Sequence, residues 1–296
     1  MHYTGQIYRP PLEVSTPLLE VTYGCSHNKC SFCTMYNKTK FGVSPLEDVE
    51  SDIIELANSK RRNVIPMERI YLLNGDPFVL SAQRLLEISE LIHKHIPEVK
   101  TITAYCSFYN LLNKTKEDMI KLKEAGYNEL WFGVETGYQK VLDYINKGTD
   151  LDGYYEGLDK MKAAGIEYHA IIMQGIAGNG NSIENAKQTA KVLNYYPPKG
   201  VYVMSTAVMP NSPLYDMRER GDFVETTNRE NLEEQICLLE NLDLPDTVLY
   251  SSGHMVNMVR VTGHLDKKEK MINELKDALD TIDPELLDMT NQNIAM

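Results

Sequence analysis

The chain has 296 residues, of which 43% are hydrophobic and 24% are charged, so it can bury a substantial core. Its 30 basic and 42 acidic residues give a net charge of -12, so no broad cationic surface is available and nucleic acid is disfavoured as a partner. No apolar run approaches the roughly 20 residues that span a bilayer, and no charged start followed by an apolar stretch opens the chain, so we expect a cytoplasmic protein without a membrane partner.

The chain alternates short apolar runs with longer stretches of helical period from about residue 17 to residue 208. This alternation is typical of βα units around a parallel sheet. The expected strands are rich in β-branched and aromatic residues and cover residues 18–23, 69–74, 101–106, 129–134, 167–173 and 201–207. Between them, one helical face of residues 81–96 carries Leu85, Ile88, Ile92 and Ile96. Thr115 with Asp118 forms a capping box that begins a further helix, and Gly126 ends it.

Six strands with intervening helices predict an α/β fold, a partial (β/α)6 TIM-like barrel, because about 190 residues carry the pattern and a closed eight-unit barrel needs ~250. After Pro210 the pattern changes to two amphipathic helices, near residues 229–242 and 267–282, with a non-helical stretch at 251–264 between them. We therefore expect three parts. These are an N-terminal lead-in at 1–16, a core barrel at 17–225 and a mainly helical C-terminal extension at 226–296 that covers the barrel.

The cysteines give the first chemical signal, because Cys25, Cys30 and Cys33 lie together in a loop directly after the first expected strand. Five cysteines in a chain of this length do not form a disulfide framework. Barrel enzymes place their chemistry in loops at the carboxyl ends of strands. Three thiolates can hold three corners of a cubane iron-sulfur cluster and leave one iron open, and an open metal position marks a reactive site. Cys106 and Cys237 stand alone, and we expect small buried side chains there.

Two alternatives for this loop remain open from the residues alone. The first is a zinc knuckle built from the three cysteines and His27. The soft thiolate set and the lack of a second cysteine pair weigh against zinc, and His27 lies inside the cysteine spacing, where a solvent-facing loop residue is the simpler reading. The second alternative is a loop that binds no metal.

The cysteine loop, the aromatic Phe32 just before its last cysteine, and the βα alternation together resemble the radical S-adenosylmethionine (SAM) superfamily. The segments WFGVETG at 131–137 and MQGI at 173–176 are similar to the branch that contains coproporphyrinogen dehydrogenases, elongator-type acyl transferases and methylthiotransferases. The similarity spans roughly residues 17 to 215. The first cysteine gap departs from the family, because four residues separate the first two cysteines here and the commonest pattern has three.

The resemblance implies a radical SAM enzyme with a [4Fe-4S] cluster, whose open iron is chelated by the amino and carboxylate groups of SAM. An electron from the reduced cluster cleaves SAM to a 5'-deoxyadenosyl radical, which abstracts hydrogen from a small or medium organic substrate. It also implies a reductant such as flavodoxin or ferredoxin as a partner. A second function remains open, that of a non-catalytic carrier or chaperone that keeps this fold and delivers a cofactor such as haem.

Residues after two strands resemble the family's contacts to the methionine and ribose parts of SAM. Asn74, Gly75, Asp76 and Pro77 are similar to the glycine-rich motif that meets the methionine amino group. A backbone carbonyl approaches an ammonium closely only where no side chain intervenes, which accounts for the glycine. An ordinary Gly-Asp-Pro turn is the alternative. Glu135 falls where the family has a Glu or Gln that accepts from the ribose hydroxyls, and an ion pair at the barrel rim is its competing role.

Further contacts carry over one residue at a time. Lys147 aligns with a family arginine that pairs with the methionine carboxylate, and it keeps the charge but not the fork geometry; a solvated surface lysine is the alternative. Gln174 and the backbone near Ile176 fall where the family contacts ribose and adenine, whereas Ile171 replaces an acidic residue of some relatives. Ala207 resembles the adenine-side backbone position of the last strand, with a plain buried strand residue as the alternative.

The sequence disfavours several classes of radical SAM chemistry. Only two cysteines lie outside the loop, so an auxiliary four-cysteine cluster cannot be built and methylthiotransferase chemistry is disfavoured. Residues 1–16 leave no room for an N-terminal cobalamin domain, and we expect no acetyltransferase domain after the barrel. In the extension, polar residues alternate with apolar ones, which indicates either a face toward substrate or a solvated edge strand. These polar residues are Ser251, His254, Asn257, Arg260 and His264.

Overall fold

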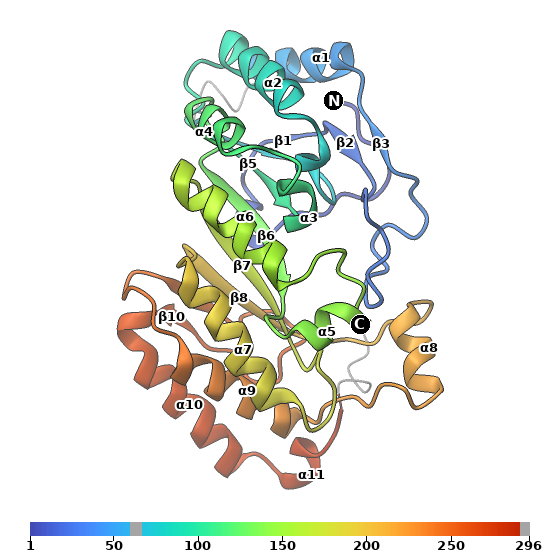
Figure 1. The fold of residues 1–296 in the computed structure, drawn as a ribbon, viewed down its shortest axis with the longest axis vertical. Helices are drawn as coiled ribbons and strands as arrows, with labels where there is room; N and C mark the ends of the chain where they lie inside the picture. Colours follow the sequence, from blue (N-terminus) through green and yellow to red (C-terminus); the bar gives the residue numbers. More distant parts are fainter. Residues whose placement is uncertain (60–66, 291–296) are drawn as a thin grey trace. The chain divides into compact units, whose positions relative to one another are not determined.

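The computed structural model describes residues 1–59 and 67–290 (Figure 1). The chain forms two compact units. Unit 1 comprises Met1–Asn28, Met35–Phe132 and Glu156–Tyr168. Unit 2 comprises Lys29–Thr34, Gly133–Tyr155 and the described residues from His169 onward. The expected division into lead-in, core and extension stays a prediction beside this grouping.

Among the described residues, the strands form an eight-stranded sheet in the order β1-β4-β5-β6-β7-β8-β9-β10 and a separate two-stranded pair, β2-β3. Their bounds are β1 Leu18–Leu19, β2 Thr22–Tyr23, β3 Gly42–Val43, β4 Arg69–Leu72, β5 Thr101–Cys106, β6 Glu129–Glu135, β7 Glu167–Gln174, β8 Gly200–Ser205, β9 Leu249–Ser251 and β10 Thr262–His264. β1, β4, β5 and β6 pair in parallel, as do β7, β8 and β9. The predicted α/β class with parallel βα strands is confirmed.

One detail of the strands differs from expectation. The run at 18–23 is divided, because the chain leaves β4 after Leu19 and pairs with β3 from Thr22 onward. The stretch at 251–264 is non-helical as expected, and it contributes to β9 and β10, which pair antiparallel at the sheet edge, in line with the edge-strand alternative. The buried Asn257 between these strands donates to the carbonyls of Val203 and Ser252 and accepts from the Ser205 amide. The C-terminal extension thus adds the strands β9 and β10 to the sheet, and it also supplies helices.

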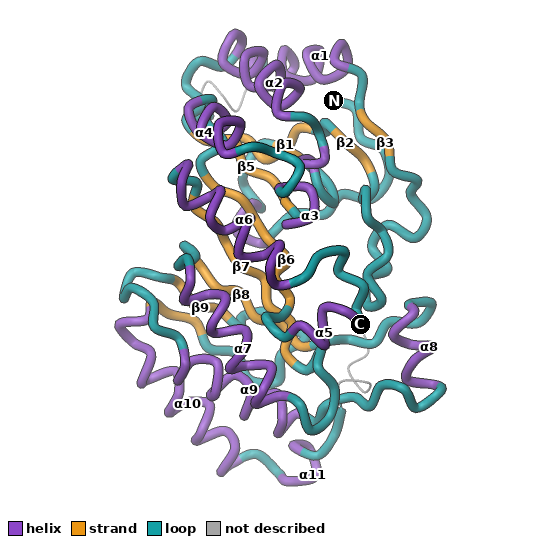
Figure 2. The backbone as a smooth tube through the Cα atoms, in the orientation of Figure 1, coloured by secondary structure: helices purple, strands orange, loops and turns teal. Residues whose placement is uncertain are grey.

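The helices alternate with the strands along the chain (Figure 2). Their bounds are α1 Leu46–Ala57, α2 Ala82–His95, α3 Phe108–Leu111, α4 Lys116–Glu124, α5 Gln139–Tyr144, α6 Leu151–Ala164, α7 Ser182–Tyr195, α8 Pro213–Glu219, α9 Asn228–Asn241, α10 Lys268–Thr281 and α11 Pro284–Leu287. Short 3-10 turns lie at η1 Pro11–Glu13, η2 Pro77–Val79 and η3 Leu265–Lys267. No described helix is long and apolar enough to span a membrane.

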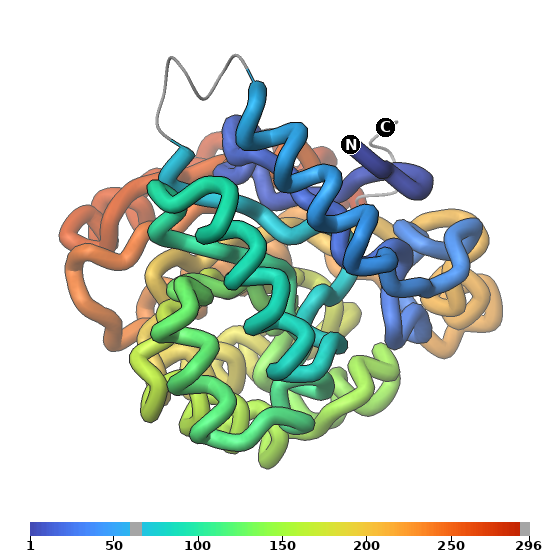
Figure 3. The backbone as a smooth tube through the Cα atoms, turned by 90° about the horizontal axis from the view of Figure 1, so that it is seen from above, coloured from blue at the N-terminus to red at the C-terminus, as the bar shows by residue number. Residues whose placement is uncertain are grey.

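The helices of unit 1 follow from local sequence signals. The apolar face expected for α2 is buried, with Leu85, Ile88 and Ile92 in the core, and each such side chain contributes about 1.5–3 kcal/mol. The Thr115 and Asp118 capping box begins α4 as predicted. α1 and α2 lie side by side (Figures 1 and 3).

In unit 2, α9 lies between α7 and α10 (Figure 2). α9 and α10 match the two predicted helices of the extension within one residue at each end. A capping box between Thr227 and Glu230 fixes the start of α9. The start of α9 determines which of its acidic side chains reach the loop between β7 and α7, namely Glu230 and Glu234.

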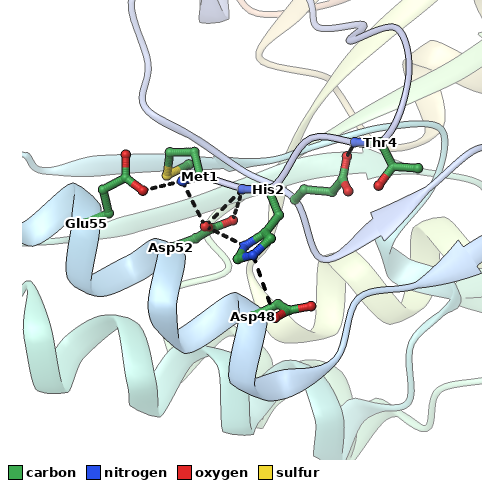
Figure 4. A network of polar contacts seen from close by, with 7 residues as sticks. Met1, His2, Thr4, Asp48, Asp52 and Glu55 are labelled. Carbon is green, nitrogen blue, oxygen red and sulfur yellow. Dashed lines mark hydrogen bonds and ion pairs between the residues drawn. The ribbon is translucent and has the colours of Figure 1, made fainter.

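Within unit 1, two buried carboxylates, Asp52 and Glu20, hold the N-terminal segment (Figure 4). The His2 backbone amide donates to both oxygens of Asp52 on α1, at 3.0 and 2.9 Å, and the His2 ring contacts the same carboxylate. The Thr4 amide donates to Glu20 at 2.9 Å. The Met1 amino group pairs with Glu55, also on α1. Residues 1–4 are therefore held between α1 and the β1-β2 connection.

A buried ion pair joins η1 to the sheet of unit 1. Glu13 is 2% exposed and accepts from Arg69 at 2.6 Å and from the Trp131 ring nitrogen at 3.0 Å. Arg69 also pairs with Glu129 at 2.8 Å. Burial alone would raise the pKa of Glu13, but hydrogen bonds from Arg69 and Thr16 outweigh it and hold that pKa below its ordinary value of 4.5.

Glu13→Gln should lower the free energy of unfolding by about 1–3 kcal/mol at neutral pH, because Arg69 and Trp131 lose a charged acceptor. Since the folded-state pKa of Glu13 is depressed, its contribution is present above pH 4.5 and is lost as pH falls through the lower folded value. Urea unfolding from neutral pH to about pH 3 would show this loss below pH 4.5 in the wild type and a smaller one in the variant.

Glu68→Gln is the matched control, because Glu68 forms an exposed pair with Lys100. We expect a change within about 0.5 kcal/mol for this variant. Equal effects of the two substitutions would contradict the assigned role of Glu13.

Candidate active site

The loop of Cys25 lies against the turn that follows β4. The Gly75 amide donates to the Gly24 carbonyl at 3.1 Å. A Cβ added at Gly75 would lie 2.7 Å from the Cβ of Cys25, so a side chain there would displace the cysteine. The predicted glycine is therefore required by the cysteine loop itself, apart from any role toward a ligand.

Asp76 is held by the start of α3. Its Oδ2 accepts from the Ser107 amide at 3.1 Å, from the Ser107 hydroxyl at 2.5 Å and from Asn110 at 2.7 Å. The Asn110 amide group also donates to the Ser26 hydroxyl at 3.0 Å, beside Cys25. Burial raises the pKa of Asp76 although these donors oppose the rise. Asn110 thus links the cysteine loop to the turn that carries Asp76.

Two buried acceptor atoms of this turn have no donor among residues 1–59 and 67–290, namely Oδ1 of Asn74 and Oδ1 of Asp76. Asn74 adopts a left-handed backbone with φ of 77° and donates through its side chain to the Thr22 carbonyl at 3.0 Å. Unpaired acceptors of this kind cost about 1–3 kcal/mol each unless a ligand or water supplies a donor. Both oxygens are acceptors, so only a group with N–H or O–H donors can satisfy them.

Lys114 supports the same turn and was not singled out in the sequence. Its side chain is buried and donates to the carbonyls of Phe78 and Leu80 at 2.5 and 2.9 Å, just after Pro77. Its ammonium lies 5.3 Å from the Phe78 ring centroid. Burial lowers the pKa of Lys114. A lysine in a loop before a capped helix is ordinarily solvated, so no local pattern predicts this contact.

The second half of the cysteine loop belongs to unit 2. The Ser31 amide donates to the Ile145 carbonyl at 2.8 Å, and the Ser31 carbonyl accepts from the Leu214 amide at 2.7 Å. Cys30 and Cys33 flank this anchored stretch and are partly exposed. The segment is thus fixed between the end of α5 and the start of α8. No three His, Cys, Asp or Glu side chains in residues 1–59 and 67–290 are placed to share one metal ion.

Glu135 and Lys147 form a buried ion pair at 2.8 Å, with 9% and 14% of their side chains exposed. Burial alone would lower the pKa of Lys147, but the charges of Glu135 and Cys30 outweigh it and raise that pKa. The Lys147 ammonium lies 5.9 Å from the Phe32 ring centroid. The alternative of a solvated surface lysine is therefore wrong, and the ion pair foreseen as the competing role of Glu135 is present.

Glu135 also has a left-handed backbone, with φ of 60°, at the end of β6. This conformation costs a non-glycine residue roughly 1–2 kcal/mol, so neighbouring contacts must hold it. The Thr136 amide donates to the Val134 carbonyl at 2.7 Å across the turn. The turn directs the Glu135 side chain back to Lys147.

The remaining expected contacts lie at the ends of β7 and β8. The Gln174 side chain is buried and donates to the Ser205 hydroxyl at 2.8 Å, and in the described part of the chain no group donates to its Oε1. The Ile176 carbonyl accepts from the Tyr144 hydroxyl. The strand expected to reach Ala207 stops at Ser205. Ala207 therefore lies just beyond the end of β8, where it is half-buried, and it is not a buried strand residue.

His27, Cys106 and Cys237 lie at partly or fully buried positions. His27 is half-buried with its ring 6.4 Å from that of Tyr109. Cys106 and Cys237 are buried, as expected, and burial raises the pKa of both thiols.

Residues 19–193 match the family model described as the radical SAM superfamily. The chain belongs to the radical SAM superfamily. This membership confirms the expected enzyme class and its two cofactors, a [4Fe-4S] cluster and SAM.

An uncharacterized protein of Methanocaldococcus jannaschii is 24% identical to this radical SAM chain over 236 residues, which cover 76% of the chain and 70% of that protein. Heme chaperone HemW of Bacillus subtilis is 23% identical over 201 residues, which cover 67% of the chain and 52% of HemW. The structure of coproporphyrinogen III oxidase (HemN) from Escherichia coli is similar with a TM-score of 0.54 at 16% identity, over 76% of this chain and 52% of that one.

The radical SAM chain therefore spans about half the length of HemW and of HemN. The likeness to HemN shows the fold alone. Heme chaperone HemW and a tRNA uridine(34) acetyltransferase of Methanocaldococcus jannaschii, 24% identical over 156 residues that cover 51% of this chain and 27% of that protein, match the branch named from the WFGVETG and MQGI segments.

Asn110→Ala should lower the free energy of unfolding by about 1–3 kcal/mol, because buried Asp76 loses a donor and Ser26 loses its link. Asn113→Ala is the control, since Asn113 is exposed one turn further on, and it should change stability by about 0.5 kcal/mol or less. Chemical denaturation of both variants measures the difference. An Asn110→Ala protein as stable as the control would show that Asp76 does not depend on this donor.

Proposed function

We propose that Cys25, Cys30 and Cys33 bind the [4Fe-4S] cluster and that the chain uses SAM to abstract hydrogen from a small or medium organic substrate. The three-thiol loop inside a radical SAM chain is the observation that carries this proposal. When bound, the cluster supplies the electron that cleaves SAM to methionine and a 5'-deoxyadenosyl radical. A reductant such as flavodoxin or ferredoxin would deliver that electron.

The turn of unit 1 supports a role in holding the methionine amino group. Gly75 brings this turn against the loop of Cys25, and the acceptor oxygens of Asn74 and Asp76 have no donor among the described residues. An ammonium brings three N–H donors and a charge that a buried carboxylate favours. Asp76 would be held for this task by Ser107 and Asn110. Pro77 and the carbonyls bound by Lys114 would keep the turn rigid.

The ion pair of unit 2 supports contacts to the carboxylate and ribose of SAM. Lys147 retains a full charge in a buried setting, and Glu135 can accept from two ribose hydroxyls while it remains paired. Gln174 offers its unpaired Oε1 to a further donor. The backbones at Ile176 and Ala207 would line the adenine. Phe32 would help to exclude water beside Lys147.

A second candidate is a haem carrier or chaperone that keeps the fold. The match to heme chaperone HemW over 67% of this chain favours it. Counting 5'-deoxyadenosine formed per turnover separates the two functions, because a carrier should form little or none. Haem binding without 5'-deoxyadenosine would support the carrier.

Anaerobic reconstitution with iron and sulfide, followed by reduction in the presence of SAM, should yield 5'-deoxyadenosine from the wild-type protein. Cys30→Ala should reduce the yield at least about tenfold, because the cluster loses one of its three thiolates. Chromatography of the quenched reaction measures the product. Cys237→Ala is the matched control, since Cys237 is a buried cysteine on α9 outside the loop, and its yield should equal that of the wild type.

Full product formation by Cys30→Ala would contradict the assigned ligands. Zinc bound to the wild-type protein, without iron and without product, would favour the zinc knuckle in place of the proposed function.

A further inference from the structure

Two carboxylates of α9 hold the loop between β7 and α7 at both of its ends. Glu234 accepts from the Gly175 amide at 2.8 Å, at the start of the loop. One helical turn earlier, Glu230 accepts from the Gly180 amide at 2.6 Å and from the Asn179 side chain at 2.7 Å. The loop that begins directly after Gln174 is therefore fixed by the C-terminal extension.

Gly175 shows how closely α9 approaches this loop. Its backbone is left-handed, with φ of 77°. A Cβ at this position would lie 2.4 Å from the Thr226 hydroxyl and 2.7 Å from Oδ1 of Asn231. Only glycine fits both the backbone and the space, so the amide of Gly175 meets Glu234 in one fixed geometry.

The other oxygen of Glu234 begins a buried path to the turn at Glu135. It accepts from the Asn185 side chain at 2.6 Å. Oδ1 of Asn185 accepts from the Thr136 hydroxyl at 2.5 Å, and that hydroxyl accepts from the Tyr138 amide at 2.9 Å. Asn185 and Thr136 are fully buried. The strained turn that presents Glu135 is thus fastened, through two side chains, to α9.

The electrostatics of Glu234 make this link sensitive to protonation. Burial raises the pKa of Glu234 to about 7, and the charge of Glu230 adds to the rise, while the Asn185 and Gly175 donors oppose it. The other titratable groups that face it are Cys237 on α9, Tyr144 on α5 and Tyr250 on β9. The carboxylate accepts both N–H donors, whereas the protonated acid presents a hydrogen where an acceptor is required.

We propose that Glu234 is a positioning residue for SAM, which fixes the β7-α7 loop at Gly175 and, through Asn185 and Thr136, the turn that carries Glu135. This inference rests on the proposed SAM contacts of Glu135 and of the residues around Ile176. Glu234 lies outside residues 19–193, which match the family model. The proposal therefore gives the C-terminal extension a role in SAM binding.

The test compares SAM binding by Glu234→Gln and Glu233→Gln in the reconstituted protein with its cluster oxidised, by calorimetry from pH 6 to pH 8.5. At high pH, Glu234→Gln should bind SAM about tenfold more weakly than the wild type, because its amide nitrogen meets a second donor. Near pH 6 the two dissociation constants should converge to within about threefold, since most of the wild-type Glu234 is then protonated. The ratio of the constants cancels the titration of the SAM amino group itself.

Glu233→Gln is the matched control on the same helix and should bind SAM like the wild type at each pH. Thr136→Val breaks the path at its far end and leaves the Gly175 contact in place; we expect it to weaken SAM binding about fivefold at high pH. Hydrogen exchange of residues 175–181 in the SAM-free protein should be faster in Glu234→Gln and unchanged in Thr136→Val.

A Glu234→Gln protein with wild-type affinity at every pH, or a ratio that does not change with pH, would overturn the positioning role. If Glu234→Gln does not fold, wild-type affinity in Thr136→Val overturns it equally. A wild-type protein that carries its cluster but binds no SAM would instead contradict the proposed function, and the inference with it.

Discussion

Removing a carboxylate from water costs several kcal/mol unless N–H or O–H donors replace its hydration, and the strand ends of this chain are arranged around that requirement. Asp76 receives its donors from the start of α3, Glu135 from the connection between α5 and α6, and Glu234 from the loop between β7 and α7. In each case the donors and the carboxylate come from different elements. Satisfying the buried charge therefore also fixes the loop that presents it.

The carboxylates of unit 2 meet this requirement in different ways. Glu135 is paired with a cation, Lys147, and the charge of Glu135 helps to raise the pKa of Lys147. Burial raises the pKa of Glu234 to about 7, because its neutral donors only partly offset the loss of hydration. A hydrogen-bonded path through Asn185 and Thr136 joins the two. The result is one ion pair at the proposed SAM site and one protonation-sensitive carboxylate that supports it.

Features with a local signal were predictable from the sequence. Helical periodicity located α2, a capping box located the start of α4, and both helices of the extension were found within one residue. The change of partner after Leu19 was not predictable, because the run at 18–23 is uniformly suited to a strand and only β3, distant in sequence, draws the chain away. For the stretch at 251–264, alternation left an edge strand and a face toward substrate both open, and strands as short as β9 and β10, three residues each, could not be bounded from it.

The same contrast holds for the site. The cysteine loop and the turn after β4 follow strands, and Glu135 is the last residue of β6, so their positions relative to the strands carry the signal. Lys114 and Glu234 carry none, because a charged residue near or on an amphipathic helix ordinarily faces solvent. Glu234 meets Gly175 across 59 positions, and Lys114 meets the carbonyl of Phe78 across 36. Such contacts depend on tertiary structure, which no local pattern encodes.

The most direct measurement of the central claim is the electron paramagnetic resonance spectrum of the anaerobically reconstituted and reduced protein, recorded before and after SAM is added. The account predicts the signal of a reduced [4Fe-4S] cluster that changes shape when SAM is added, because SAM binds the iron that the three thiolates leave open. A cluster signal that SAM leaves unchanged, or a protein that takes up zinc and no iron, would contradict it.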